Sequence, residues 1–166
     1  MSTRMRKGLI VALLHIAIVA SLGAKLLVDR ARLPRVWART GPVDPDLPIR
    51  GRYVRLLIEA EAAGALGVGR EFSFMPVSLS VENGKLVARH DEAGTNYVGG
   101  RDRDGQRVAV LSQPLAYFIP EKVPDPSRRQ PGEELWVEVT VPKRGAPRPI
   151  RLGVKKDGVL TPLTQP

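Results

Sequence analysis

Side chains that could support metal or acid–base chemistry are few in this chain. His90, Asp91 and Glu92 place three metal-capable residues in a row. Adjacent residues on a strand or turn point in different directions, and a closed metal site needs ligands that converge from separate segments. The only other histidine, His15, lies in an apolar stretch near the N-terminus. We therefore interpret residues 90–92 as a solvated turn and expect neither a metal site nor a cofactor.

Serine chemistry has little support from the spacing of the residues. The sequence contains no Gly-x-Ser-x-Gly elbow, and His90 is the only histidine beyond the apolar stretch that could act as a base. A Ser–Lys dyad stays open on composition alone. Its candidate members are Ser73, Ser78, Ser80 and Ser112 with Lys85 or Lys143. Glu133 and Glu134 are interpreted as the start of a strand rather than a catalytic carboxylate pair, so we name no catalytic residue.

An apolar run over residues 8–27 indicates whether the rest of the chain is attached to a membrane. It is close to the ~20 residues that a membrane-spanning helix needs, and Arg4, Arg6 and Lys7 precede it. The same basic start, with small residues around Ser21, also fits a cleavable secretory signal. We expect an uncleaved anchor, because no Ala-x-Ala pattern stands at the end of the run, and keep the removed signal as the alternative.

Basic residues lie on both sides of the apolar run, so charge alone does not decide its orientation in the membrane. Basic residues precede it, and four more follow it: Arg30, Arg32, Arg35 and Arg39. The positive-inside rule therefore gives no majority. A short tail before a first apolar segment is typical of a signal-anchor, so we expect a cytoplasmic N-terminus and a body outside the cytoplasm.

The net charge of +9 is concentrated near the anchor. Residues 1–39 hold eight Lys/Arg and one acid, whereas residues 40–166 hold 18 basic and 16 acidic residues. The surplus can meet anionic lipid headgroups. The body lacks the basic stripe with interleaved aromatic residues that nucleic-acid binding would need. We expect the lipid bilayer as a partner, another envelope or membrane protein as a further candidate, and no nucleic acid.

Residues 29–49 are predicted to be a juxtamembrane segment and a proline-rich linker, following a tail and anchor over residues 1–28. The helix could continue past the membrane until Pro34 breaks it. Trp37 among arginines suits the membrane interface. Three prolines between residues 42 and 48 indicate an extended chain.

Residues 50–166 are predicted to form one all-β domain, a small antiparallel barrel or meander. Three segments alternate apolar and polar residues, which puts one face on a core and the other in water. They are residues 53–59, 77–82 and 135–141. In the first of them Glu59 falls on the solvent side. Three dipeptides can form type I′ hairpin turns: Asn83-Gly84, Asp104-Gly105 and Asp157-Gly158. The alanine-rich residues 59–69 hint at a helical turn.

Two groups of motif residues resemble one family. Residues 42–45 read Pro-Val-Asp-Pro, Gly51, Tyr53 and Leu56 follow, and residues 117–121 read Tyr-Phe-Ile-Pro-Glu. In these the chain resembles the GDYXXLXY family of small bacterial membrane-anchored proteins, over roughly residues 26–163. The resemblance implies an inner-membrane protein with a single helix anchor and a domain that faces the periplasm. It implies no activity.

Two departures from the family motif favour a structural role for it. Arg52 stands where the family has Asp, and Ile58 stands where it has the second Tyr. An Asp that acted as a general acid or metal ligand would lose that role at Arg52. Ile58 falls on the apolar face of its segment, so the lost hydroxyl there is a packing change.

The motif residues also allow a functional interpretation, in which Asp44, Arg50, Tyr53, Tyr117 and Glu121 gather at one end of the barrel as a polar binding patch. The structural interpretation gives Asp44 a turn and pairs Glu121 with Arg50. The sequence thus predicts a non-enzymatic, membrane-anchored interaction or accessory domain. The alternatives are a membrane-anchored β-barrel hydrolase of the signal-peptidase kind and a small-ligand or peptide binder that uses the region of Tyr53 and Glu121.

Overall fold

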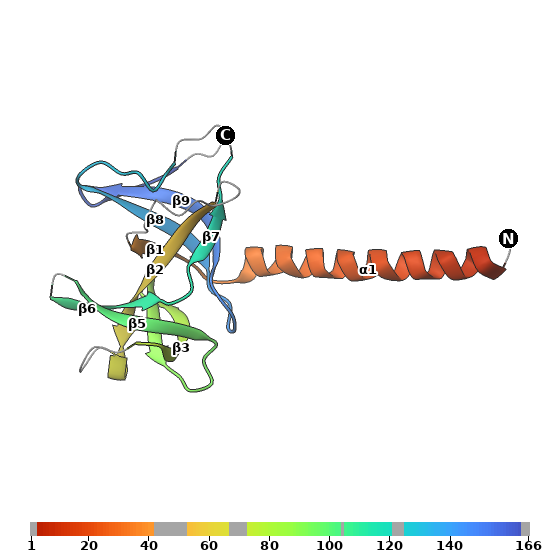
Figure 1. The fold of residues 1–166 in the computed structure, drawn as a ribbon, viewed down its shortest axis with the longest axis horizontal. Helices are drawn as coiled ribbons and strands as arrows, with labels where there is room; N and C mark the ends of the chain where they lie inside the picture. Colours follow the sequence, from red (N-terminus) through yellow and green to blue (C-terminus); the bar gives the residue numbers. More distant parts are fainter. Residues whose placement is uncertain (1–2, 42–52, 67–72, 104, 121–124, 164–166) are drawn as a thin grey trace. The chain divides into compact units, whose positions relative to one another are not determined.

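One long helix, α1 (Thr3–Arg32), forms most of the first of two units into which the chain divides (Figure 1). The first unit ends at Leu33 and the second begins at Pro34. The computed structural model describes residues 3–41, 53–66, 73–103, 105–120 and 125–163. Within α1, Lys7–Arg32 is long and apolar enough to cross a membrane, and its most apolar stretch is not buried against protein. The predicted N-terminal apolar helix is thus confirmed.

Polar side chains inside α1 bond to the helix itself. His15 Nδ1 lies 2.8 Å from the carbonyl oxygen of Val11, so the tautomer that carries the proton on Nδ1 can donate to it. Ser21 Oγ donates to the carbonyl oxygen of Ile18 at 2.8 Å. Polar groups that bond locally can be accommodated in hydrocarbon. Carbonyl groups of the helix backbone therefore provide hydrogen-bond partners for both polar side chains.

The second unit is built from strands. In chain order they are β1 (Arg35–Gly41), β2 (Tyr53–Ala63), β3 (Met75–Glu82), β4 (Lys85–His90), β5 (Asn96–Arg103), β6 (Gln106–Leu111), β7 (Leu115–Phe118), β8 (Glu133–Thr140), β9 (Arg148–Lys156) and β10 (Val159–Pro162), with a short 3₁₀ turn, η1 (Gly64–Leu66), after β2. Their spatial order is β10-β9-β8-β1-β2-β4-β3-β5-β6. The predicted mainly antiparallel β domain is confirmed.

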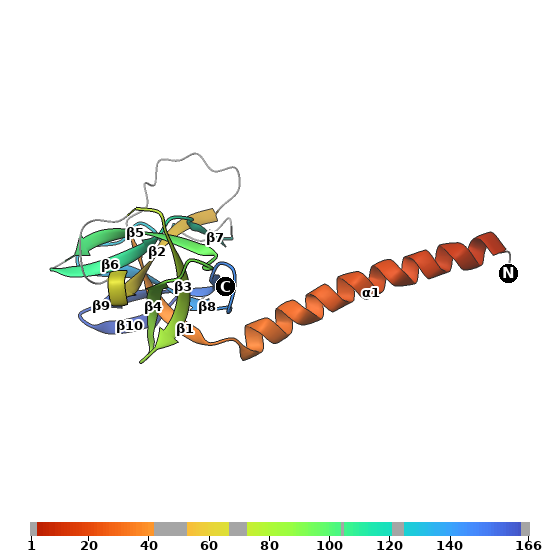
Figure 2. The same ribbon diagram turned by 90° about the horizontal axis from the view of Figure 1, so that it is seen from below.

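Strand β2 holds the domain together. It pairs with β4 and with β6, so the path β2-β4-β3-β5-β6 returns to β2. Its first residues pair with β7. Figure 1 shows β2 running between β8 and β9 on one side and β5 and β6 on the other, and Figure 2 shows β9 and β10 on the side opposite β5 and β6. The β2–β4 pair is parallel, which the sequence did not predict, while the other pairs are antiparallel. A path that returns to its first strand removes exposed sheet edges.

Strand β1 corrects the predicted linker. It begins directly after Pro34 and lies between β8 and β2, with Val36 and Ala38 buried against the core. Trp37, predicted at the membrane interface, lies on this strand opposite Glu138. The two-residue alternation of β1 is hidden among arginines, which favoured the juxtamembrane interpretation. The rest of that predicted linker, residues 42–49, lies outside the described residues.

The predicted hairpin turns are confirmed where the structure describes them. Asn83 and Gly84 join β3 to β4 with φ angles of 50° and 74°. Asp157 and Gly158 join β9 to β10 with φ angles of 50° and 82°. Positive φ at both central residues is the requirement of a type I′ turn. Gly105, between β5 and β6, has a φ of 74°, and its neighbour Asp104 lies outside the described residues.

The core follows the predicted alternation with one informative exception. Val54, Leu56 and Ile58 of β2 are buried as expected. Glu59, predicted to face water, is only 8% exposed, because the opposite face of β2 is covered at this point by side chains of other strands. β2 continues to Ala63 before the η1 turn, so a strand replaces the first part of the helical turn predicted for residues 59–69.

Candidate functional site

The structure describes two of the five residues of the predicted polar patch. Tyr117 of β7 pairs with Val54 and is buried, whereas Tyr53 pairs with Phe118 and is 45% exposed. Neighbouring positions of a ladder face opposite sides, so Tyr53 and Tyr117 do not share a face. The rings of Tyr53 and Phe118 meet edge to face, with centroids 5.5 Å apart. Asp44, Arg50 and Glu121 lie outside the described residues, and the patch stays a prediction.

The other sequence candidates occupy ordinary surface positions. Asp91 Oδ1 accepts a hydrogen bond from the backbone nitrogen of Ala93 at 3.0 Å, as in a turn. Among the described residues, no three His, Cys, Asp or Glu residues gather as a metal site would require. Lys85 is 63% exposed and pairs with Glu61, and Ser80 donates to Glu82 at 2.8 Å. A Ser–Lys dyad needs a buried, neutral lysine, and neither Lys85 nor the exposed Lys143 is placed in that way.

A charged cleft of about 530 Å³ lies where the two sides of the domain meet. Its charged and aromatic lining includes Trp37, Arg39, Glu59, Arg103, Glu134 and Trp136. The residues come from β1, β2, β5 and β8, strands that are far apart in the sequence. We name this hollow the charged cleft.

Strand pairing brings the charged residues together. Arg39 of β1 lies directly across from Trp136 of β8, and Glu134 is two residues earlier on β8, on the same face. β1 also pairs with β2, where Thr40 is opposite Ile58, next to Glu59. The register of β1 therefore determines which side chains of β2 and β8 face each other.

A network of ion pairs fills the inner part of the charged cleft. Arg39 Nη2 lies 3.0 Å from Glu134 Oε1, and Arg103 Nη2 lies 3.6 Å from the same oxygen. Arg103 Nη1 donates to Glu59 Oε2. Arg103 thus connects two carboxylates from different strands, and Glu134 is shared by two arginines. Such a network holds its members in fixed positions more firmly than isolated surface pairs do.

Glu59 is the most deeply placed ionisable group of the charged cleft. Burial raises the pKa of its carboxyl above the ordinary value of 4.5. The positive charges of Arg39 and Arg101 oppose this rise in pKa, and the negative charge of Glu134 adds to it. Gly41 lies beside both side chains: a Cβ there would be 3.5 Å from Arg101 Nη1 and from Glu59 Oε1, which is ordinary van der Waals contact.

Tryptophans and cations form one wall of the charged cleft. Trp136 Nε1 donates to Glu134 Oε2 at 3.1 Å, and Lys155 Nζ lies 4.7 Å from the centre of the Trp136 ring. Arg151 lies over the Trp37 ring at 5.4 Å. Both contacts are within cation–π range. The aromatic rings are thereby fixed and can offer a rigid surface to a ligand.

Ion pairs engage the carboxylates that line the charged cleft. Each of the carboxylates of Glu59, Glu61 and Glu134 is held by an arginine or lysine. The described lining contains no serine, histidine or cysteine. A charged ligand could exchange for one partner of such an ion pair.

Sequence reasoning missed the charged cleft for identifiable reasons. Arg39 was assigned to a linker, Glu59 to a solvent face and Glu134 to the start of a strand. A signal was nevertheless present: Trp37 and Arg39, like Glu134 and Trp136, are two residues apart and so share a strand face. The first pair carries a positive charge and the second a negative charge. Opposite charges of this kind indicate two strands that can lie side by side in a sheet.

No protein-family model matches the chain, and no curated protein or solved structure is significantly similar to it. The resemblance to the GDYXXLXY family therefore rests on the motifs alone and stays a prediction. Part of those motifs, residues 42–52, lies outside the described residues.

Proposed function

We propose that this chain is a single-pass protein of the bacterial inner membrane whose β domain faces the periplasm and acts as a non-enzymatic interaction module. The observation that carries the proposal is the connection between α1 and β1. The apolar helix ends at Arg32 and β1 begins at Arg35, with only Leu33 and Pro34 between them. The three Cα–Cα steps from Arg32 to Arg35 span about 11 Å at most. A bilayer that holds α1 would therefore keep the domain at its surface.

The charged cleft supports an interaction role for that domain. Arg39 and Arg103 are 30% and 21% exposed, so they stay within reach of a carboxylate from outside. Such a carboxylate could replace Glu134 as their partner, since arginine binds carboxylates through paired hydrogen bonds. The occupant we propose is an acidic segment of another envelope or membrane protein.

Photo-crosslinking in intact cells tests this proposal. A photoreactive p-benzoylphenylalanine at Lys85, on the rim of the charged cleft, is expected to give a discrete membrane-associated adduct. The matched control is the same substitution at Arg89, which is on the same strand and similarly exposed but does not line the cleft. An Arg39→Ala change is expected to weaken the Lys85 adduct. Adducts that are equal at both positions, or that survive Arg39→Ala unchanged, would contradict the proposal.

A further inference from the structure

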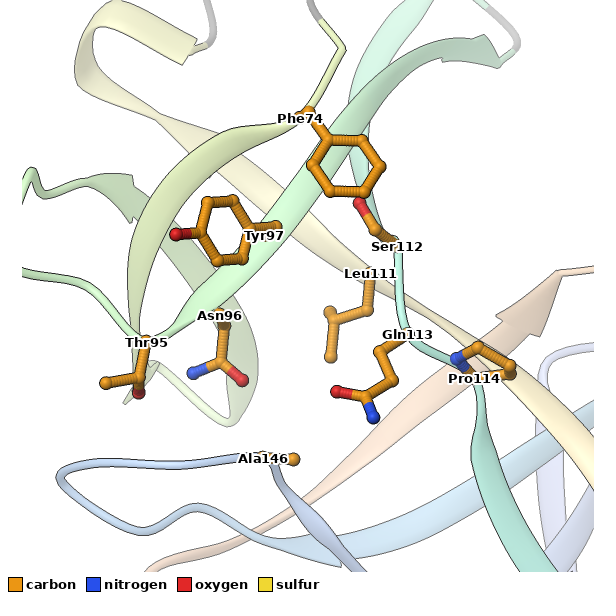
Figure 3. A pocket seen from close by; sticks show the side chains of 9 residues that line it. All are labelled: Phe74, Thr95, Asn96, Tyr97, Leu111, Ser112, Gln113, Pro114 and Ala146. Carbon is orange, nitrogen blue, oxygen red and sulfur yellow. The ribbon is translucent and has the colours of Figure 1, made fainter.

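A second hollow, of about 360 Å³, shares no lining residue with the charged cleft (Figure 3). We name it the neutral pocket. Its lining includes Phe74, Thr95, Asn96, Tyr97, Ser112 and Gln113. None of its lining residues is charged, although 26% of the chain is. Its volume is within the ~300–1,000 Å³ of small-ligand pockets. The lining therefore favours an uncharged ligand.

Two exposed aromatic rings form one wall of the neutral pocket. Phe74 is 72% exposed and Tyr97 is 47% exposed. Their ring centroids are 5.8 Å apart, with an angle of 37° between the planes. The two rings thus present apolar faces to water next to a hollow, where a ligand could cover them.

The backbone of Phe74 is strained in a way that packing does not explain. Its φ angle is 59°, in the left-handed region that residues with bulky side chains rarely adopt. Among the described residues, the other two non-glycine positions with positive φ are Asn83 and Asp157, which form hairpin turns. The Phe74 ring gains little burial in return. Strain of this kind without a stability gain points to a functional position.

Polar groups opposite the rings are held in place. The backbone nitrogen of Gly145 donates to Thr95 Oγ1 at 2.8 Å, and Asn96 Nδ2 donates to the carbonyl oxygen of Gly145 at 3.1 Å. Figure 3 shows the side chains of Asn96, Leu111 and Gln113 directed toward the same space. Amide and hydroxyl groups both donate and accept hydrogen bonds. The pocket thus combines an aromatic wall with uncharged hydrogen-bonding groups, of which Thr95 and Asn96 are held by Gly145.

We propose that the neutral pocket binds a neutral oligosaccharide. A pyranose ring has a face of C–H groups that packs on an aromatic ring, whose negative face attracts the partly positive hydrogens. Its vicinal hydroxyls match the donor–acceptor pairs of Asn96 and Gln113. Phe74 stands in the stacking position, and the amides stand where the hydroxyl rim would lie. This inference does not depend on the proposed role of the charged cleft.

A neighbouring hollow extends the site to more than one sugar. It measures about 340 Å³ and shares Phe74, Leu111 and Ser112 with the neutral pocket. Gly99 and Gly100 contribute to its lining without side chains beyond Cα, and Arg101 is the charged residue of that lining. A chain of sugars can therefore cross Phe74 and occupy both hollows.

A peptide fits the neutral pocket less well. One mode of peptide binding adds an extended strand to a free sheet edge through main-chain hydrogen bonds. Here the backbone around Tyr97 is already paired: its carbonyl oxygen accepts from the nitrogen of Ser112 at 2.8 Å, and Tyr97 pairs with Pro76 of β3. Both edges of β5 are thus occupied beside the pocket.

Saturation-transfer NMR on the full chain in phospholipid nanodiscs tests the proposal, because nanodiscs avoid sugar-based detergents. The probes are cellotetraose and tetra-N-acetylchitotetraose, which are both uncharged, with pentaproline as the peptide probe. We expect transfer to the protons of at least one tetrasaccharide. Phe74→Ala and Tyr97→Ala should each reduce that transfer at least fivefold. Phe118→Ala removes another exposed ring, outside the pocket, and should leave it unchanged.

A second variant separates loss of binding from loss of folding. Phe74→Gly removes the ring and relieves the positive φ, so its melting temperature should equal or exceed that of the parent while transfer to the sugar is lost. The proposal is overturned if neither sugar receives transfer, if transfer persists in Phe74→Gly, or if pentaproline alone responds.

Discussion

Glu59 of β2 and Arg103 of β5 form an ion pair across 44 residues of sequence. The side chain of Glu59 is 7% exposed and that of Arg103 is 21% exposed, so the pair is largely removed from water. Arg103 also reaches Glu134 of β8. One arginine thus ties together strands from both sides of the domain, and the charged cleft depends on it.

Removing this arginine should destabilise the domain. Arg103→Ala leaves the buried Glu59 carboxylate without its bonded partner, which we expect to lower the free energy of unfolding by about 1–3 kcal/mol. Arg89→Ala is the control, since Arg89 pairs with Glu82 at the surface, where solvent screens the pair, and its loss should cost less than the loss of Arg103. Urea unfolding of the full chain in nanodiscs measures both. Equal losses of unfolding free energy in the two variants would contradict the prediction, because the inner network would then stabilise the domain no more than a surface pair does.

The raised pKa of Glu59 should determine how the stability of the domain changes with pH at this site. Its pKa in the folded chain is raised above 4.5, so the folded state holds the proton more tightly than the unfolded state. The Glu59 contribution to stability is therefore full below pH 4.5 and declines as pH rises through the raised pKa. Glu59→Gln removes this decline. The melting temperature of Glu59→Gln relative to the parent should thus increase from pH 4 to pH 7.

Glu82 is the control, because its pKa shifts in the opposite direction. The hydrogen bonds from Arg89 and Ser80 lower its pKa below 4.5. Its contribution is present above pH 4.5 and is lost as pH falls through the lowered pKa. The advantage of the parent over Glu82→Gln should therefore shrink in acid. If the Glu59→Gln difference moved in the same direction as the Glu82→Gln difference, the arginines and not burial would control Glu59.

Strand β1 should tolerate charge on one face only. Ala38 is 2% exposed in the core, so Ala38→Asp buries a carboxylate and is expected to prevent stable folding. Arg35→Asp, at an exposed position of the same strand, should leave the melting temperature within a few degrees. Proteolysis and thermal scans distinguish the two variants. Equal tolerance of both changes would restore the linker interpretation of this segment.

Substitution by alanine should destabilise the domain to different degrees at Gly94 and at Gly153. A Cβ at Gly94 would lie 2.4 Å from the carbonyl oxygen of Val77, which is backbone. A Cβ at Gly153 would lie 2.9 Å from a ring carbon of Trp37 and 3.2 Å from the carbonyl oxygen of Thr161, which are longer distances than the one at Gly94. We expect Gly153→Ala to cost about 1–3 kcal/mol and Gly94→Ala to cost more. Chemical denaturation measures the order, and a larger loss in Gly153→Ala would contradict it.

Local patterns predicted the local structure and little of the charged cleft. The apolar run, the alternating residues of β2, β3 and β8, and the Asn-Gly and Asp-Gly turns are all readable because each depends on near neighbours. Alternation tells which face a residue shares but not which strand lies beside it. The closure of β2 onto β6 and the meeting of Glu59 with Arg103 depend on long-range pairing, so local patterns did not predict them. The arginines of β1 concealed its alternation altogether.

The most direct test of the central claim is a C-terminal alkaline phosphatase fusion, expressed in bacteria and blotted after membrane fractionation. Alkaline phosphatase is active only after export. We predict active enzyme on a full-length, membrane-bound product, as an uncleaved anchor with an exported domain requires. Inactive enzyme would place the domain in the cytoplasm. Active enzyme on a shortened, soluble product would mean a removed signal, and either result would contradict the anchored periplasmic module.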